Sequence, residues 1–156
     1  MIDMNEKVQR LVMHEGIRLM PYYCTKGKQT IGVGRNLDDN PLTEEEKRVC
    51  GDWEKGITKQ AAFYLLRHDI ERTEKECRKK IAIYDALDDE RQYALLDMAF
   101  NMGVAGVLKF KKMLIAMACG YFEDAAAECL DSKYAKETGQ RAKRIAETIR
   151  TGKFRV

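Results

Sequence analysis

The chain has 156 residues, of which 45% are hydrophobic and 34% are charged. This length suffices for one domain, or for two small lobes that share a helix, and the apolar content is too high for a disordered chain. No run without a charged residue is much longer than half of the ~20 residues that a membrane span requires. We therefore expect a soluble globular protein with no membrane span.

The N-terminus and the cysteines indicate where the protein is made. Residues 1–7 carry charges where a signal peptide has its apolar stretch. The five cysteines form no C-x-x-C pair, and their odd number leaves one unpaired in any disulfide scheme, which favours a reducing cytosol. Because His14 and His68 stand at no ligand spacing from a cysteine, we expect no metal and no cofactor.

Positive charge gathers at the C-terminal end of the chain. Residues 133–156 hold eight Lys and Arg against two Glu, whereas the whole chain has a net charge of +3. This pattern suggests attraction to a polyanion, either nucleic acid or a bacterial envelope, and a solvated helix face is the alternative. A nucleic-acid reader would need base-reading side chains, which residues 141–150 do not offer, so we expect no nucleic-acid partner.

The first part of the chain predicts a helix and a hairpin. Residues 2–14 have the pattern of a short amphipathic helix, and residues 21–37 that of a β-hairpin with a glycine turn. In the second strand, Thr30, Gly32 and Gly34 share a face that is almost bare of side chains. Such a face leaves room for a ligand to approach the backbone closely around Thr30, and a bulged or twisted edge strand is the alternative.

The remaining elements are predicted to be helical. Thr43 and Glu46 have capping-box spacing. A long helix is expected at residues 59–80, amphipathic at its start and charged at its end, as in a helix that bridges two lobes. Further helices are expected at residues 89–102, 108–119, 122–130 and 141–150.

These elements predict the fold class α+β, mostly α. One domain, residues 1–156, is expected to contain a small N-terminal α+β lobe, a bridging helix and a C-terminal helical lobe. The predicted boundaries are residues 15–58 for the first lobe, 59–80 for the bridging helix, and 1–14 with 81–156 for the second lobe.

Glu15 is the first candidate catalytic residue, because it stands where the first helix ends and the hairpin begins. Partial burial of a carboxyl group at such a junction would keep it protonated, as a general acid requires, and an ordinary surface residue is the alternative. Glu15, eight residues, Cys24, five residues and Thr30 form a spacing that resembles the catalytic pattern of phage-type lysozymes, the endolysins of glycoside hydrolase family 24.

The resemblance continues in family order along nearly the whole chain. The segments that carry it are residues 22–27, 30–34, 56–58, 97–103 and 141–152. It implies a lysozyme-like two-lobe fold. It also implies a muramidase that cuts the β-1,4 bond between N-acetylmuramic acid and N-acetylglucosamine in bacterial peptidoglycan.

The resemblance also implies roles for individual residues. Glu15 matches the general acid and Thr30 the residue that holds the attacking water. Asn101 matches a polar residue of the cleft, and Leu37 and Phe110 fall near positions that line the sugar sites.

Three further residues match supporting positions. Arg141 matches an arginine that pairs with the catalytic glutamate and holds it in place, and Tyr134 stands where an aromatic side chain contributes to substrate binding. Arg35 replaces a histidine, so we expect an Arg35–Asp69 ion pair in place of a pH-sensitive one.

Cys24 departs from the T-even branch of the family, which has Asp at this position, whereas other branches have Cys. A thiol with a pKa near 8.5 is mostly neutral at pH 7. The charge and role of Cys24 therefore stay open. The rule that relates carboxylate separation to stereochemistry cannot be applied without a second carboxylate, and inversion is the default expectation.

The resemblance implies a partner and a location as well. We expect a monomer that acts on peptidoglycan and depends on a holin for access to the wall. The enzyme would stay in the host cytoplasm until the membrane is permeabilised and then act in the periplasm or cell wall. A catalytically impaired relative that only binds peptidoglycan is the alternative, although the presence of Glu15 and Thr30 argues against it.

Overall fold

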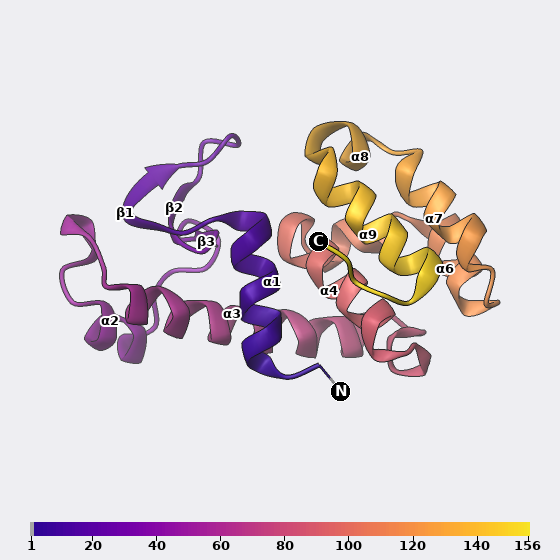
Figure 1. Ribbon diagram of the computed structural model, residues 1–156. Coiled ribbons are helices and arrows are strands. Elements are labelled where there is room, and N and C mark those ends of the chain that lie inside the picture. Colours follow the sequence, from indigo (N-terminus) through magenta and orange to yellow (C-terminus); the bar gives the residue numbers. More distant parts are fainter. Residues whose placement is uncertain (1) are drawn as a thin grey trace. The chain divides into compact units, whose positions relative to one another are not determined.

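The protein is mostly helical, with one small antiparallel sheet near the N-terminus, which confirms the expected α+β class (Figure 1). The computed structural model describes residues 2–156. Contacts divide the chain into two compact units, residues 3–71 and residues 72–156 with Ile2. The predicted lobes, which assign residues 1–14 to the helical lobe, differ from this division and stay a prediction.

The first unit begins with helix α1, Met4–Glu15. The carboxylate of Asp3 caps it by accepting a hydrogen bond of 2.8 Å from the amide of Glu6. The helix ends at Gly16, whose positive φ of 73° turns the chain toward the hairpin. The catalytic candidate Glu15 is thus the last residue of α1.

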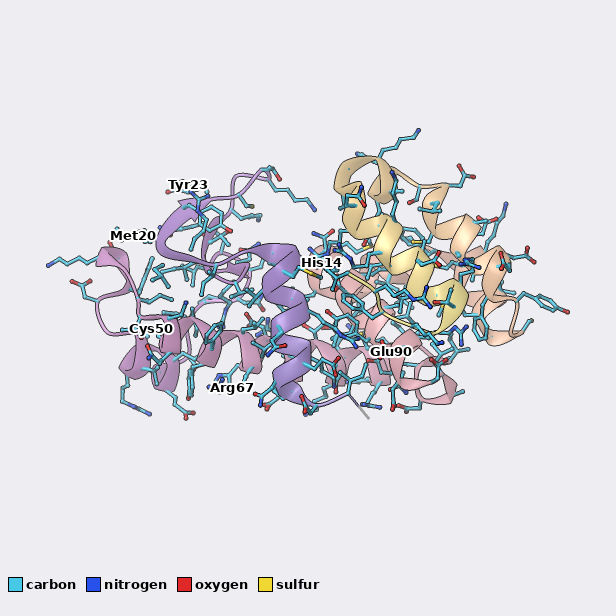
Figure 2. All side chains as sticks on the ribbon, in the orientation of Figure 1. His14, Met20, Tyr23, Cys50, Arg67 and Glu90 are labelled. Carbon is cyan, nitrogen blue, oxygen red and sulfur yellow. The ribbon has the colours of Figure 1, made fainter. Side chains whose placement is uncertain are left out.

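A three-stranded sheet follows, with strand order β1-β2-β3. The strands are β1, Arg18–Tyr23, β2, Gln29–Gly32, and β3, Arg35–Asn36. In the antiparallel register, Tyr22 pairs with Thr30 and Ile31 pairs with Arg35, and an irregularity lies between residues 18 and 22 of β1. Met20 and Tyr23, labelled in Figure 2, lie on β1 with exposed side chains.

The bare face expected on the second strand is filled by neighbouring elements. A Cβ atom added at Gly32 would lie 3.5 Å from Cβ of Ala62, so this glycine packs against a helix, and Thr30 is buried. At Gly34 the same space is taken by the side chain of Glu15. Protein atoms therefore fill the space beside Gly32 and Gly34.

Two helices complete the first unit. The predicted capping box is present at the start of α2, Glu44–Cys50, and a 3-10 turn, η1, covers Trp53–Lys55. Helix α3, Lys59–Lys80, begins at the predicted residue, with the Thr58 hydroxyl accepting a hydrogen bond from an amide of the first turn. These elements enclose a core that includes Ile31, Leu42, Ile57, Ala62 and Leu65.

The second unit contains the end of α3 and the remaining helices. In chain order they are η2, Tyr84–Ala86, α4, Asp89–Met102, α5, Val104–Leu108, α6, Lys111–Ala118, α7, Phe122–Leu130, α8, Lys133–Thr138, and α9, Gln140–Thr151. The helices predicted at residues 89–102 and 122–130 have the predicted bounds. The helix expected at residues 108–119 is present as α6 but begins later, at Lys111, and the short helix α5 before it was not predicted.

Helix α9 packs against α4, α7 and α8, and Figure 1 shows these helices gathered together. The core between them is apolar and includes two buried thiols, Cys77 and Cys129. Burial raises the pKa of each of these thiols to about 12. Within residues 2–156, no helix has both the length and the apolar character that crossing a membrane requires.

Candidate active site

The carboxyl group of Glu15 lies against the backbone of Gly34. A Cβ atom added at Gly34 would stand 3.0 Å from Oε2 of Glu15 and 3.2 Å from its Cδ. His14, labelled in Figure 2, marks the last turn of α1, from which Glu15 follows directly. The end of α1 therefore delivers a carboxyl group to the turn between β2 and β3, where only a glycine leaves room for it.

Cys24 and Thr30 come together near the turn that joins β1 to β2. The amide of Cys24 donates a hydrogen bond of 2.9 Å to the carbonyl of Lys28, and the amide of Gly27 donates one to the carbonyl of Cys24. Backbone amides of Lys28 and Lys26, and the hydroxyl of Thr30, lower the pKa of the Cys24 thiol. The hairpin turn therefore favours the thiolate form of Cys24.

Tyr22 pairs with Thr30 across the sheet and lies near both Glu15 and Cys24. Burial raises the pKa of Tyr22, and the negative charges of Glu15 and Cys24 raise it further. The guanidinium of Arg18 stacks on the ring of Tyr22, 4.2 Å from the ring centre. The first unit thus brings all three predicted catalytic residues, Glu15, Cys24 and Thr30, to the small sheet, with Tyr22 as a common neighbour.

Thr30 forms one further contact of consequence. Its hydroxyl donates a hydrogen bond of 2.9 Å to the carbonyl of Lys28, and the residue is 3% exposed. The hydroxyl oxygen keeps lone pairs that can accept a hydrogen bond, for example from a water molecule.

Arg35 occupies a buried ionic cluster. Its Nη1 donates to Oδ1 of Asp69 at 3.0 Å, which confirms the predicted ion pair. The same guanidinium also donates to both carboxylate oxygens of Glu46, at 2.7 and 3.0 Å. The sequence identified Glu46 only as a capping residue, and its second role follows from tertiary contacts.

Glu46 has two more partners. Oε1 accepts a hydrogen bond from the amide of Thr43 at 3.0 Å, and Oε2 lies 2.9 Å from Nδ1 of His68. Burial raises the pKa of Glu46, but hydrogen bonds from Arg35, Thr43 and His68 outweigh it and lower this pKa to about 2. The cluster holds Glu46 as a carboxylate throughout the physiological pH range.

In the second unit, Arg141 holds a buried carboxylate. Its Nε donates to Oδ1 of Asp97 at 2.8 Å and its Nη2 to the carbonyl of Asp97 at 3.2 Å. The hydroxyl of Tyr93 donates to Oδ2 of the same carboxylate at 2.8 Å. Asp97 is fully buried and was not singled out from the sequence, although an aspartate within an apolar helical stretch was a usable signal.

Arg141 and Glu15 belong to different units, so their predicted pairing stays a prediction. The contacts to Asp97 fix the guanidinium of Arg141 within the second unit. They leave the proposed interaction with Glu15 to be tested by mutation.

The predicted substrate residues are divided between surface and core. Asn101 is exposed, whereas Leu37 is 9% exposed and packs in the core of the first unit. Little of the Leu37 side chain is left for a sugar, and its predicted role has no support in the structure. Phe110 and Tyr134 meet edge to face with ring centres 6.3 Å apart, and burial raises the pKa of Tyr134.

Phe110 also lines a pocket of about 410 Å³ in the second unit. Its walls come from the α5–α6 junction, α7 and the residues that follow α7: Lys109–Met113, Glu128, Asp131 and Ser132. Both acidic and basic side chains line this pocket, together with the apolar Phe110 and Met113.

The basic C-terminal end is partly neutralised by acidic neighbours. Arg150 forms ion pairs with Glu147 and with Glu123. Lys143 is exposed on α9. Among residues 2–156, no group of three or more His, Cys, Asp and Glu side chains could hold a metal ion.

Comparisons with known proteins identify the family to which this chain is similar. A sequence model described as phage lysozyme matches residues 12–147. The chain is 35% identical over 151 residues to the pre-baseplate central spike protein Gp5 of Enterobacteria phage T4, an alignment that covers 88% of this chain and 26% of the spike protein. The chain thus spans about a quarter of that relative's length.

Two other relatives are matched over most of their length. The chain is 32% identical over 152 residues to the probable T4-type lysozyme 1 of Dictyostelium discoideum, covering 88% of this chain and 89% of that protein. It is 27% identical over 128 residues to the endolysin of Acyrthosiphon pisum secondary endosymbiont phage 1, covering 82% of this chain and 77% of that protein.

Proposed function

The chain belongs to the phage lysozyme family, and on this premise we propose that it is a muramidase. The proposed reaction is hydrolysis of the β-1,4 bond between N-acetylmuramic acid and N-acetylglucosamine in bacterial peptidoglycan. The observation that carries the proposal is the carboxyl group of Glu15, which lies against Gly34 in the same three-stranded sheet region that bears Cys24 and Thr30.

In the proposed mechanism, Glu15 is the general acid. Its proton passes to the glycosidic oxygen as the bond from this oxygen to C1 of the muramic acid breaks and an oxocarbenium-like centre develops at C1. The carboxylate that remains takes up a proton from solvent after the leaving sugar has departed.

Thr30 and Cys24 complete the reaction. The hydroxyl oxygen of Thr30 accepts a hydrogen bond from the attacking water, which adds to C1 and gives up a proton. The thiolate of Cys24 takes the role that Asp has in the T-even branch: it stabilises the cation and accepts this proton. The lowered pKa of Cys24 supports this role, because it increases the thiolate fraction near neutral pH. With water as the nucleophile, the configuration at C1 is inverted.

Substrate binding is proposed for the exposed Asn101 and for Phe110 with its pocket, where a polar part of the peptidoglycan strand fits the mixed charge of the walls. Tyr134 supports Phe110 through their edge-to-face contact. Arg141 is proposed to pair with Glu15.

Turnover of purified peptidoglycan by wild type, Glu15→Gln and Glu54→Gln tests the proposal. Glu15→Gln keeps the shape of the side chain but removes the transferable proton, so turnover should fall by about two to four orders of magnitude with folding intact. Glu54→Gln is the same chemical change at an exposed position of the same unit and should leave turnover unchanged. Activity of Glu15→Gln within tenfold of wild type would refute the role of Glu15. Binding of walls by wild type without turnover would favour an impaired peptidoglycan-binding protein.

The biological setting that we propose is host-cell lysis by an endolysin that reaches the wall through a holin. The similarity to a central spike protein favours a second setting, in which the same reaction serves a phage spike. Two experiments separate these settings. Lysis that depends on co-expression of a holin supports the endolysin. Co-purification of the protein with phage particles supports the spike.

A further inference from the structure

Gly34 lies close to the Glu15 carboxyl group. The turn that contains it joins β2 to β3, and its φ of +71° is a conformation that favours glycine. Oε2, Cδ and Cγ of Glu15 would all stand within 3.5 Å of a Cβ atom at this position. The carboxyl group therefore rests along the backbone of the turn, and any shift of the turn is passed to it.

The residue that follows Gly34 is anchored unusually well. The guanidinium of Arg35 has five N–H donors, and all five form hydrogen bonds. Nε donates to the carbonyl of Asn40 at 2.8 Å and Nη2 to that of Pro41 at 3.2 Å. The other donors reach Glu46 on α2 and Asp69 on α3. Arg35 therefore connects the end of the turn to both helices and to the loop between β3 and α2.

The Cα atoms of Gly34 and Arg35 are one peptide unit, about 3.8 Å, apart. We infer that Arg35 is a positioning residue for the general acid: its buried cluster with Glu46 and Asp69 holds Gly34 at the place where this glycine supports the Glu15 carboxyl group. This inference rests on the proposed function of Glu15.

A purely stabilising role explains the buried cluster of Arg35, Glu46 and Asp69 less well than a positioning role. A buried ion pair is often no better for stability than apolar residues of similar volume, because desolvation offsets the attraction between the charges. A planar guanidinium held by five acceptors restricts both the position and the orientation of the adjoining backbone. Such restriction matters most where a reacting group must be held within a fraction of an ångström.

The first experiment replaces the support itself. Gly34→Ala puts a Cβ atom 3.0 Å from Oε2 of Glu15 and must displace the carboxyl group. Gly51→Ala is the matched control, because Gly51 also has a positive φ, of 64°, but has no atom within 4 Å of an added Cβ. Since a misplacement of about 1 Å costs about 100-fold in rate, we expect kcat on purified peptidoglycan to fall at least tenfold in Gly34→Ala, with KM changed less than threefold. Gly51→Ala should stay within threefold of wild type.

The second experiment tests whether Arg35 acts through Gly34. Arg35→Lys keeps the charge but offers three donors for five acceptors. We expect kcat to fall about fivefold or more with KM changed less than threefold, because a displaced Glu15 slows the reaction more than it weakens binding. Arg48→Lys, an exposed change on α2, is the control and should leave both kcat and KM unchanged. Should Arg35→Lys fail to fold by circular dichroism, Asp69→Asn, which changes one of the two carboxylates, takes its place in the same assays.

The double variant Gly34→Ala/Arg35→Lys completes the test. If Arg35 acts through Gly34, the combined loss in kcat is smaller than the product of the two single losses. Equal effects of Gly34→Ala and Gly51→Ala, or independent effects of the two substitutions, would overturn the inference. Full activity of Glu15→Gln would instead refute the proposed function, so the two failures are distinguishable.

Discussion

Glu46→Gln gives a quantitative test of the buried cluster in the first unit. The substitution keeps the shape of the side chain and an acceptor for the amide of Thr43, but it removes the charge that faces Arg35 and His68. Arg35 keeps Asp69 as a counter-ion, so no buried charge is left without a partner. The change in stability therefore measures the interactions of the Glu46 charge.

The magnitude follows from the pKa of Glu46, which is about 2 in the folded protein against an ordinary 4.5. A depressed carboxyl pKa adds stability above the unfolded-state pKa, and this stability is lost as the pH falls through the folded-state pKa. The shift corresponds to about 3 kcal/mol at pH 7, about 1 kcal/mol at pH 3 and almost nothing at pH 2. Glu46→Gln should therefore lower the free energy of unfolding by about 3 kcal/mol at pH 7 and by little at pH 2.

Urea unfolding followed by the fluorescence of Trp53 measures this difference. Trp53 is the single tryptophan, and it packs against the core of the first unit, so it reports on the unit that contains Glu46. Glu44→Gln, an exposed change on the same helix, is the control and should cost less than about 0.5 kcal/mol at any pH. A loss below about 1 kcal/mol for Glu46→Gln at pH 7, or an equal loss at pH 7 and pH 2, would refute the reasoning.

The remaining predictions concern position 24 and the basic C-terminal end. If Cys24 acts as a thiolate, Cys24→Ser should lower turnover of purified walls at least about tenfold and Cys24→Asp should restore it. The wild-type pH profile should then rise with a midpoint below the ordinary thiol pKa, because hydrogen bonds at the hairpin turn lower the pKa of Cys24. Near-wild-type turnover by Cys24→Ala would leave Glu15 as the essential ionisable group. Lysis should also weaken as salt rises, and less steeply in Lys143→Ala/Arg144→Ala, because these charges attract an anionic wall. A salt profile that is flat in both proteins would show that this end is only a solvated surface.

Most of the helices were predictable from local signals. Capping residues and apolar spacing gave the start of α2 at Thr43 and both ends of α3 and α4. The short helix α5 and the start of α6 at Lys111 were not, because the N-cap residue of α6, Phe110, makes no side-chain capping bond. Phe110 therefore precedes α6 and lines the pocket.

The sequence predicted those residues of the candidate site whose spacing along the chain resembles the family pattern. The spacing singled out Glu15, Cys24 and Thr30, and the Arg35–Asp69 pair was expected and is present. The role of Glu46 was not, since its contact with Arg35 joins a capping residue to a strand through tertiary packing. The substrate role of Leu37 stays a prediction: this residue directly follows β3 and packs in the core of the first unit.

The thiols of the second unit provide a separate way to observe that unit. Cys77 and Cys129 are fully buried with pKa values of about 12, so in the native state they react slowly with alkylating reagents, and they react at an ordinary rate once the surrounding helices open. Trp53 reports on the other unit. Pulsed alkylation, read by mass spectrometry at Cys77 and Cys129 while Trp53 fluorescence is recorded, therefore gives an opening free energy for each unit in one unmodified chain. The comparison decides whether the two units unfold together or one before the other.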